Sequence, residues 1–341
     1  MNVKDNLNEK LQRVIQQIDF SGTVLVKQGN HMKIEVAASY ANRSEQIANN
    51  MDTRFGIASG CKLFTAIAVC QLVEEKKLSF DMRLKDCLNI DFPHFDSNIT
   101  VHQLLTHSSG IPDYFDEEVM DDYEQLWQER PVYLIKRLND FLPMFQNESM
   151  KFNPGEKFHY NNAGYIILGL IVEQHTNMTF THYVETNIFK KAGMVNSGYF
   201  SLDRLPQNCA LGYIDDTETG EWRTNIYSVP IVGGADGGAF ISSSDMIKCW
   251  KALQSNKLLG EEYTSLLLYP HIHVDEDEYY GYGVWMTKRE DKVYKYHVMG
   301  YDPGISFHSA VYPSLDLQLV ISSNKESGAY DVMKEIESQF N

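Results

Sequence analysis

Apolar positions have two different periodicities at the start of the chain, and these predict a helix followed by two strands. The segment MNVKDNLNEKLQRVIQQ has the apolar spacing that is typical of an amphipathic helix. The segment GTVLVKQGNHMKIEVAASYAN reads as two strands, because Met32, Ile34 and Val36 alternate with polar residues. Gly29 and Asn30 favour a turn between these two strands.

The middle of the chain, from about residue 57 to 215, has mostly helical patterns. The segment TNMTFTHYVETNIFKKAG starts after a Thr/Asn capping signal, and we expect its helix to stop at Gly193. Further on, SSSDMIKCWKALQ predicts a second capped helix that Ser244 or Asp245 opens.

Strand patterns return near the C-terminus in KVYKYHV, GISFHSAVY and LDLQLVISS. In the last of these strands and the turn before it, Leu315, Leu317, Leu319 and Ile321 share one face. A final helix is predicted over residues 330–340. Strands at both ends with helices between them suggest one sheet completed by the two termini, with a helical part inserted in the middle.

The organisation predicted from these patterns is a single domain over residues 8–340. Its sheet part comprises 8–56 and 216–340, and its helical part comprises 57–215. The chain shows no internal repeat, low-complexity tract or Pro/Ser-rich linker that would mark a second domain.

Composition and charge narrow the classes of partner. The chain has 341 residues, of which 43% are hydrophobic and 12% aromatic, as in a folded globular protein. A net charge of -16 argues against electrostatic binding of nucleic acid or of an anionic membrane over a broad surface. The longest apolar stretch, YIILGLIV, is far shorter than the roughly 20 residues that span a bilayer. We therefore expect neither nucleic acid nor a membrane span as a partner.

The cysteines and the N-terminal segment indicate the cellular compartment in which the protein is expected. The five cysteines form an odd, scattered set without a C-x-x-C pair, which argues against a disulfide scaffold and a zinc ribbon. The N-terminal segment lacks the apolar core of a signal peptide. As written, the sequence predicts a cytoplasmic protein, or an exported one if a leader was removed.

The first candidate for chemistry is RFGIASGCKLFTAIAVCQLVEE, which places Ser59 at the head of an apolar helix and Lys62 on the same face. A serine hydroxyl is a poor nucleophile and needs a base within hydrogen-bond reach. Burial disfavours the charged form of an amine and so favours its action as a base. Backbone N–H groups at a helix start can stabilise an oxyanion. By themselves, however, these residues also fit a capping serine beside a lysine that extends to solvent.

A second candidate lies about a hundred residues later in FNPGEKFHYNNAGYIILGLIVEQ. Tyr160 and Asn162 form a Y-x-N just before an apolar helix and after a Pro-Gly loop. A tyrosine near a lysine can have a lowered pKa and relay protons, and Asn162 offers an amide to a substrate carbonyl. Either residue alone also fits a packed aromatic beside a turn asparagine, but the order, spacing and context of the two motifs favour a catalytic site.

Together, these two motifs resemble those of the serine β-lactamase and penicillin-binding protein superfamily. The branch that they resemble most contains class C β-lactamases, D-Ala-D-Ala carboxypeptidases, D-aminopeptidases and related esterases. The flanking segments VHQLLTHSSGIPDYF, IFKKAGMVNSGYF and GGADGGAFISSSDMIKCWKAL are similar to the family over nearly the whole chain.

This resemblance implies both a fold and an activity. The implied fold is of the α+β class, an α/β/α sandwich of the β-lactamase/transpeptidase type, with an antiparallel sheet and an inserted all-helical subdomain. The implied activity is that of a serine hydrolase acting through an acyl-enzyme on ester, amide or D-amino-acid peptide bonds, with a small-molecule or peptide substrate as its partner. In it, Ser59 is the nucleophile, and Lys62 and Tyr160 transfer protons.

The third motif of the family, Lys or His followed by Thr, Ser or Gly and then Gly, is altered here. The matching segment is YHVMGYDPGISF. Aligned by its Pro-Gly pair, the triplet is VMG ending at Gly300 and lacks a cation; aligned by His297, it lacks the glycine. The strand can still present a backbone N–H near Gly300 or Tyr301 as a second oxyanion donor. The predicted substrate-binding residues are therefore Asn162, His297, Gly300 and Tyr301.

The altered motif leaves a rival interpretation open, namely a catalytically idle ligand-binding or scaffold protein on the same fold. No metal or organic cofactor is predicted. The histidines of HIHVD, residues 271–275, lack the further histidine of a complete ligand set, and no G-x-G-x-x-G loop occurs. His107 and Cys61 are expected to be structural.

Overall fold

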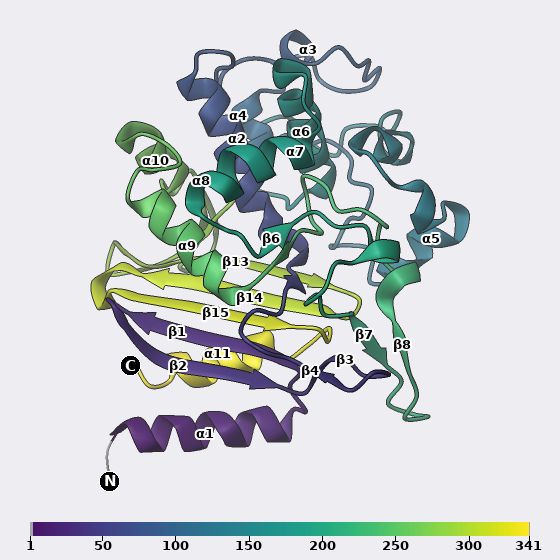
Figure 1. The fold of residues 1–341 in the computed structure, drawn as a ribbon. Helices are drawn as coiled ribbons and strands as arrows, with labels where there is room; N and C mark the ends of the chain where they lie inside the picture. Colours follow the sequence, from purple (N-terminus) through teal and green to yellow (C-terminus); the bar gives the residue numbers. More distant parts are fainter. Residues whose placement is uncertain (1–2, 341) are drawn as a thin grey trace.

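The computed structural model describes residues 3–340, and its centre is an eight-stranded antiparallel sheet (Figure 1). The strands follow the order β10-β11-β12-β13-β14-β15-β1-β2. Their bounds are β1 Gly22–Gln28, β2 His31–Ala38, β10 Ile272–Asp275, β11 Glu278–Tyr280, β12 Trp285–Arg289, β13 Lys292–Asp302, β14 Ile305–Tyr312 and β15 Leu317–Ser323. Because β1 pairs with β15, both ends of the chain contribute to one sheet, as predicted.

Three smaller sheets join segments outside the main sheet. They comprise β3 (Tyr40–Asn42) with β4 (Ile47–Ala48), β7 (Tyr213–Asp215) with β8 (Trp222–Thr224), and β9 (Phe240–Ile241) between β5 (Phe55–Gly56) and β6 (Ser197–Gly198). The last of these is important for the site, because β5 leads directly into the turn that carries Ser59.

The α-helices lie on both faces of the main sheet. Their bounds are α1 Val3–Gln17, α2 Lys62–Glu74, α3 Leu84–Cys87, α4 Val101–Leu105, α5 Leu126–Glu129, α6 Asn162–Thr176, α7 Phe180–Val184, α8 Lys190–Ala192, α9 Ser243–Gln254, α10 Glu261–Leu267 and α11 Ala329–Glu337. None of the helices within the described residues is both long and apolar enough to cross a membrane.

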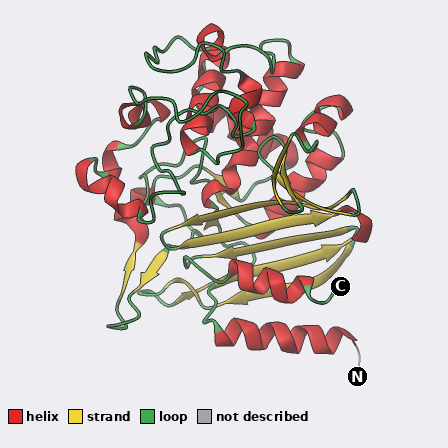
Figure 2. Ribbon diagram, turned by 180° about the vertical axis from the view of Figure 1, so that it is seen from behind, coloured by secondary structure: helices red, strands yellow, loops and turns green. Residues whose placement is uncertain are grey.

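One face of the sheet packs against the terminal helices α1 and α11, as the view from behind shows (Figure 2). Leu11 and Ile15 of α1 and Val332 and Ile336 of α11 are buried against apolar side chains of β1, β2, β14 and β15. The predicted alternation in β15 is confirmed, because Leu317, Leu319 and Ile321 all belong to this core.

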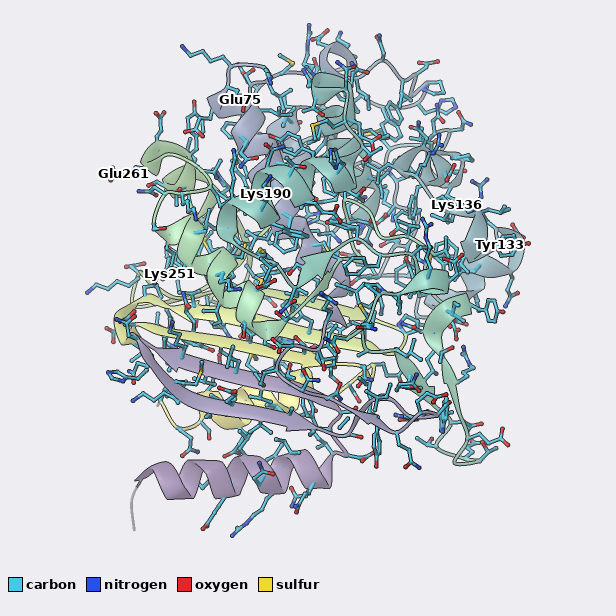
Figure 3. All side chains as sticks on the ribbon, viewed as in Figure 1. Glu75, Tyr133, Lys136, Lys190, Lys251 and Glu261 are labelled. Carbon is cyan, nitrogen blue, oxygen red and sulfur yellow. The ribbon has the colours of Figure 1, made fainter. Side chains whose placement is uncertain are left out.

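The opposite face carries the larger core, which is built around α2 and α6. Residues 62–73 of α2 are all buried, so this helix is apolar on every side rather than amphipathic. Charged side chains such as Glu75, Lys190 and Lys251 instead project from the outer surface (Figure 3). A lysine in the first turn of α2 therefore lies in the interior of the molecule.

The structure differs from the predicted elements in two places. Helix α9 begins at Ser243 and is capped by Ser242, whose hydroxyl accepts the N–H of Asp245, so the cap lies earlier than predicted. The stretch 106–161 holds only short helical turns, because Pro and Gly residues recur along it and interrupt helical hydrogen bonding. By contrast, the predicted stop at Gly193 is confirmed by its left-handed conformation at the end of α8.

Candidate active site

Ser59 lies in a tight turn between β5 and α2. The turn, Ala58–Cys61, is a short 3₁₀-helix that continues into α2 at Lys62. Ala58 is buried and has φ of 44°, a left-handed conformation that costs an alanine free energy and is kept only where surrounding structure imposes it. The strand, turn and helix thus hold the Ser59 hydroxyl at the wall of a cleft.

Lys62 is only 2% exposed, yet its ammonium group has a complete set of polar contacts. Its Nζ donates to Ser59 Oγ at 2.9 Å, to Asn162 Oδ1 at 2.8 Å and to the carbonyl oxygen of Asp236 at 2.9 Å. Three acceptors match the three N–H bonds of a lysine ammonium. The ring centroids of Tyr160 and Tyr165 lie 4.9 and 5.6 Å from the same nitrogen. The structure therefore brings both Ser59 and Asn162 into direct contact with Lys62.

Asn162 is held in place by Asp113, a residue that sequence reasoning missed. As the first residue of α6, Asn162 donates its backbone N–H to Asp113 Oδ2 at 2.7 Å, and Ala163 donates to Oδ1 at 2.9 Å. The Asn162 amide nitrogen lies 3.4 Å from Asp113 Oδ2 and 3.3 Å from the carbonyl oxygen of Phe115. Burial raises the pKa of Asp113 to about 7, and these backbone hydrogen bonds only partly oppose the rise.

Tyr160 also lies beside Ser59, but its electrostatics differ from the prediction. Its phenol hydrogen-bonds the Ser59 side chain, and its ring lies 4.9 Å from Lys62 Nζ. Burial, followed by the negative charge of Glu117, raises the pKa of Tyr160 well above its ordinary value, whereas the contact with Ser59 lowers it. The lowered pKa predicted for Tyr160 is therefore wrong, and the phenol keeps its proton.

His107 supports the Tyr160 loop, as expected of a structural histidine. Its ring centroid lies 4.4 Å from that of Tyr160, and its Nδ1 accepts the N–H of Asn161 at 3.0 Å. Its carbonyl oxygen accepts the N–H of His159 at 2.8 Å. Burial lowers the pKa of His107 well below its usual value, so the ring is neutral and can accept this hydrogen bond.

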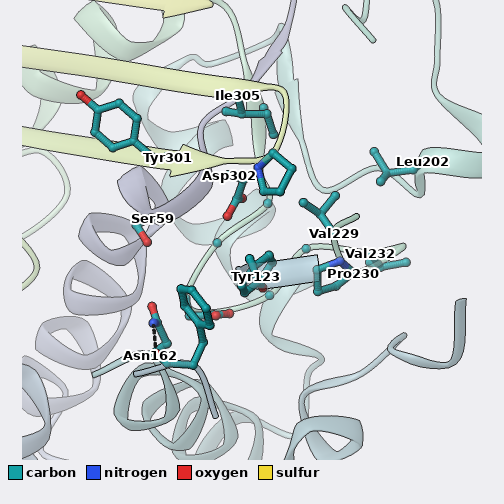
Figure 4. Close-up of a pocket in the computed structure, with 18 of the residues that line it drawn as sticks. Ser59, Tyr123, Asn162, Leu202, Val229, Pro230, Val232, Tyr301, Asp302 and Ile305 are labelled. Atoms are coloured by element: carbon teal, nitrogen blue, oxygen red, sulfur yellow. Dashed lines mark hydrogen bonds between the residues drawn. The ribbon is translucent and has the colours of Figure 1, made fainter. Parts of the chain in front are cut away.

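Gly300 of β13 passes directly over the Ser59 turn. A Cβ at this position would lie 2.2 Å from the carbonyl oxygen of Ile57 and 2.7 Å from the backbone nitrogen of Ser59, which only glycine avoids. The next residue, Tyr301, lines the cleft, although its ring points away from Ser59 and its hydroxyl hydrogen-bonds His308 (Figure 4). The backbone of Gly300 and Tyr301 is therefore close to the nucleophile, as the VMG alignment requires.

His297 lies away from this arrangement. Its Nε2 is 3.1 Å from Glu278 Oε2. Lys295, two residues earlier, binds Glu337 of α11, and alternate residues of a strand share a face. His297 therefore lies on the face of the sheet that is covered by α11, whereas Gly300 lies on the opposite face. Its position gives no support to the predicted role in substrate binding.

The cleft beside Ser59 has a volume of about 820 Å³, including the part open to solvent (Figure 4). Most of its wall is apolar or aromatic, with side chains that include Phe115, Phe141, Phe200, Val229 and Ile305. Its acidic side chains are those of Glu117, Asp236 and Asp302. Asn162 and Tyr301 also line it, so two further predicted site residues line the same cavity as Ser59.

Two of these acidic residues were missed by sequence reasoning, although both stand in quoted segments. Asp236 of GGADGG accepts a hydrogen bond from the Tyr114 hydroxyl, and burial raises its pKa. Asp302 follows the third motif, and burial and then the charge of Asp236 raise its pKa to about 8. Neither position shows a local pattern, since the groups that surround them come from distant parts of the chain.

The chain is similar to known proteins over nearly its whole length. Penicillin-binding protein 4* of Bacillus subtilis strain 168 is 26% identical over 343 residues, which cover 95% of this chain and 73% of that protein. The crystal structure of a penicillin-binding protein from Bacillus halodurans has a TM-score of 0.93 and 55% identity, covering 96% of this chain and 99% of that one.

A D-amino acid amidase from Ochrobactrum anthropi SV3 shares the fold alone, with a TM-score of 0.78, 18% identity, and coverage of 98% of this chain and 100% of that one. The model of the family described as Beta-lactamase matches residues 10–338. The chain therefore belongs to the beta-lactamase family.

Proposed function

We propose that this protein is a serine hydrolase that acts through an acyl-enzyme on ester, amide or D-amino-acid peptide bonds. The observation that carries the proposal is the 2.9 Å contact between Lys62 Nζ and Ser59 Oγ at the wall of a cleft. A D-amino acid amidase with the same fold supports this reaction class. The family membership makes a serine-dependent reaction the simplest use of the pair.

The contacts of Lys62 serve both of its protonation states. A neutral amine has two N–H bonds, which Asn162 Oδ1 and the carbonyl oxygen of Asp236 accept. Its lone pair then faces Ser59 Oγ and can take the hydroxyl proton as the oxygen attacks a carbonyl carbon. The resulting ammonium keeps the same two acceptors, so the proton is transferred without rearrangement of the site.

The oxyanion of the tetrahedral intermediate needs two hydrogen-bond donors. The backbone N–H of Ser59 is one, and the close passage of Gly300 over the Ser59 turn makes the N–H of Tyr301 the second. These donors are fixed by the turn and by β13, so they require no reorganisation during the reaction.

Tyr160 donates a proton to the leaving group in this mechanism. Its raised pKa keeps the phenol protonated, and its contact with the Ser59 side chain places the O–H beside the departing atom. As the bond to the leaving group breaks, the phenol gives up its proton and recovers one from the Lys62 ammonium. Water then attacks the acyl-enzyme, the same groups carry the protons in reverse, and Ser59 is regenerated.

A chromogenic ester assay tests the proposal against a catalytically idle protein. We expect Ser59→Ala and Lys62→Ala each to lower kcat/KM by at least about 10²-fold, because nucleophile and base are both lost. Ser322→Ala is the matched control, because Ser322 is also a buried serine three residues before a lysine, yet it lies in β15. A wild-type rate equal to that of Lys62→Ala would support the idle protein.

A further inference from the structure

The charged residue types that line the cleft beside Ser59 are all acidic. Glu117, Asp236 and Asp302 line it, and none of its lining residues is Lys, Arg or His. The family's cationic residue is missing from the third motif, and His297, which stands nearby in sequence, lies on the other face of the sheet. A substrate carboxylate therefore finds no Lys, Arg or His among the residues that line this cleft, whereas an ammonium group finds carboxyl oxygens that can accept its hydrogen bonds.

Asp302 is the carboxyl group best placed to contact a substrate. It shares the inward face of β13 with Gly300, and two residues along a strand span about 7 Å. Because Gly300 passes over the backbone of Ser59, the Asp302 side chain lies near the acyl group that Ser59 would hold. Figure 4 shows this side chain pointing into the cleft.

Asp236 and Asp302 differ in their hydrogen-bond partners, and this difference indicates different roles. Asp236 accepts a hydrogen bond from Tyr114, and its backbone oxygen accepts one from Lys62. The Asp302 carboxyl has neither a hydrogen bond nor an ion pair within residues 3–340, although protein atoms surround it closely enough to raise its pKa to about 8. The Asp302 side chain is half-buried and lines the cleft without a partner of its own, so its oxygens are available to a cation bound there.

The geometry also indicates which part of the substrate carries the cation. In an acyl-enzyme the acyl part stays attached to Ser59 Oγ, while the leaving group must diffuse away. The walled part of the cleft next to Ser59 therefore holds the acyl part, and Asp302 belongs to that wall.

We propose that this cleft selects substrates whose acyl part carries a protonated amine close to the scissile carbonyl, and that Asp302 binds this amine. The substrate class is thus an amino-acid ester, amide or peptide with a free amino group, rather than a carboxylate-bearing acyl donor. This inference rests on the serine hydrolase activity proposed above.

Three 4-nitrophenyl esters that differ only in one terminal group provide the test. The glycyl ester ends in an ammonium, the propionyl ester in a methyl group of the same size, and the malonyl ester in a carboxylate. At about pH 7, where an α-amino group of pKa about 8 is protonated, we expect kcat/KM for glycyl to exceed that for propionyl by at least about tenfold. The malonyl ester should be the poorest of the three, and rates are corrected with Ser59→Ala.

The Asp302→Asn variant should reduce the glycyl-to-propionyl ratio by at least about tenfold. The ratio is taken within one variant, so a general loss of activity cancels. Asp291→Asn is the matched control, because it removes the same charge from an exposed residue beside the opposite end of β13 and should leave the ratio unchanged.

The outcomes separate this inference from the proposed function. Serine-dependent propionyl hydrolysis without a glycyl preference, or with a ratio that Asp302→Asn leaves intact, overturns amine selection and leaves the hydrolase standing. Binding to Ser59→Ala needs no turnover, so calorimetry with glycinamide and propionamide gives a second reading. Tighter binding of glycinamide that Asp302→Asn abolishes supports the inference even if no ester is hydrolysed, and equal binding of the two amides contradicts it.

Discussion

At the scale of single residues, the buried lysine that the sequence places beside a serine has a clear physical basis. Lys62 is stable in the interior because two carbonyl oxygens, one hydroxyl and two aromatic rings surround its nitrogen. The alternative interpretation of this motif, a lysine that extends to solvent, is excluded because Lys62 is only 2% exposed. The contacts of this one side chain connect α2, α6 and the GGADGG loop.

Local motifs predicted some of the site residues and could not have predicted others. Ser59 and Lys62 lie three positions apart, so helix geometry alone brings them together. Asp113 positions Asn162 from 49 residues away, and no sequence periodicity connects the two. The pKa of Tyr160 was predicted in the wrong direction because it depends on burial and on Glu117, which only the folded structure brings near.

The raised pKa of Asp302 predicts how stability depends on pH. The ordinary value is 3.8 and the folded value is about 8, so between these values the folded protein keeps a proton that the unfolded chain releases. The free energy of unfolding should therefore fall as pH rises from about 4 to 8, by at most about 1.4 kcal/mol per unit from this group. Asp302→Asn removes this pH-dependent fall in the free energy of unfolding. Relative to the wild type, the variant should therefore raise Tm more at about pH 8.5 than at about pH 5.

The control for this measurement is Asp291→Asn, whose carboxylate is exposed at the turn before β13. Its Tm should follow that of the wild type at both pH values. A Tm difference between Asp302→Asn and wild type that stays constant with pH would show that the Asp302 carboxyl is not held protonated by the fold.

At the scale of elements, the site is formed where β13 crosses the turn between β5 and α2. The alternation and turn signals predicted the strands of both termini, because those signals are local. The sharing of one sheet by both ends of the chain was predicted, but the order of its eight strands was not, because the pairing between strands leaves no local signal in the sequence. The stretch 106–161 was misjudged as helical, because its conformation is fixed by packing around α6 and by Pro and Gly residues.

This crossing predicts a strong effect of Gly300→Ala. The added methyl group would lie 2.2 Å from the carbonyl oxygen of Ile57, so β13 and the Ser59 turn must separate. We expect ester hydrolysis to fall by at least about tenfold, as the oxyanion donors move apart. Overpacking should also lower the free energy of unfolding by about 1–3 kcal/mol, measured by denaturant titration.

Gly164→Ala is the matched control at this scale. Gly164 is equally buried, but a Cβ there would have no contact closer than 3.4 Å. Because alanine favours a helix over glycine by about 1 kcal/mol, stability should stay level or rise. Equal losses in Gly164→Ala and Gly300→Ala would mean that the close passage of β13 has no special importance.

At the scale of the whole molecule, the two ends of the chain complete one sheet (Figure 1). The cleft is lined by residues of β13 from this sheet, of α6 and of the GGADGG loop. The fold class predicted from the sequence is confirmed. The boundaries at residues 57 and 215 stay a prediction, and α9 and α10, which follow residue 215, extend the helical side. A charge of -16 over the chain agrees in sign with the acidic cleft and favours the approach of cations.

The central claim is that Lys62 activates Ser59 as a nucleophile, and covalent labelling tests it most directly. The protein is incubated with a fluorophosphonate, and peptide mass spectrometry locates the adduct over time. We predict one adduct, on Ser59, formed at least about 10²-fold more slowly in Lys62→Met, a variant of similar side-chain length without the amine. Labelling of Ser59 at the same rate in Lys62→Met, or no adduct on Ser59 in the folded wild type, would contradict the claim.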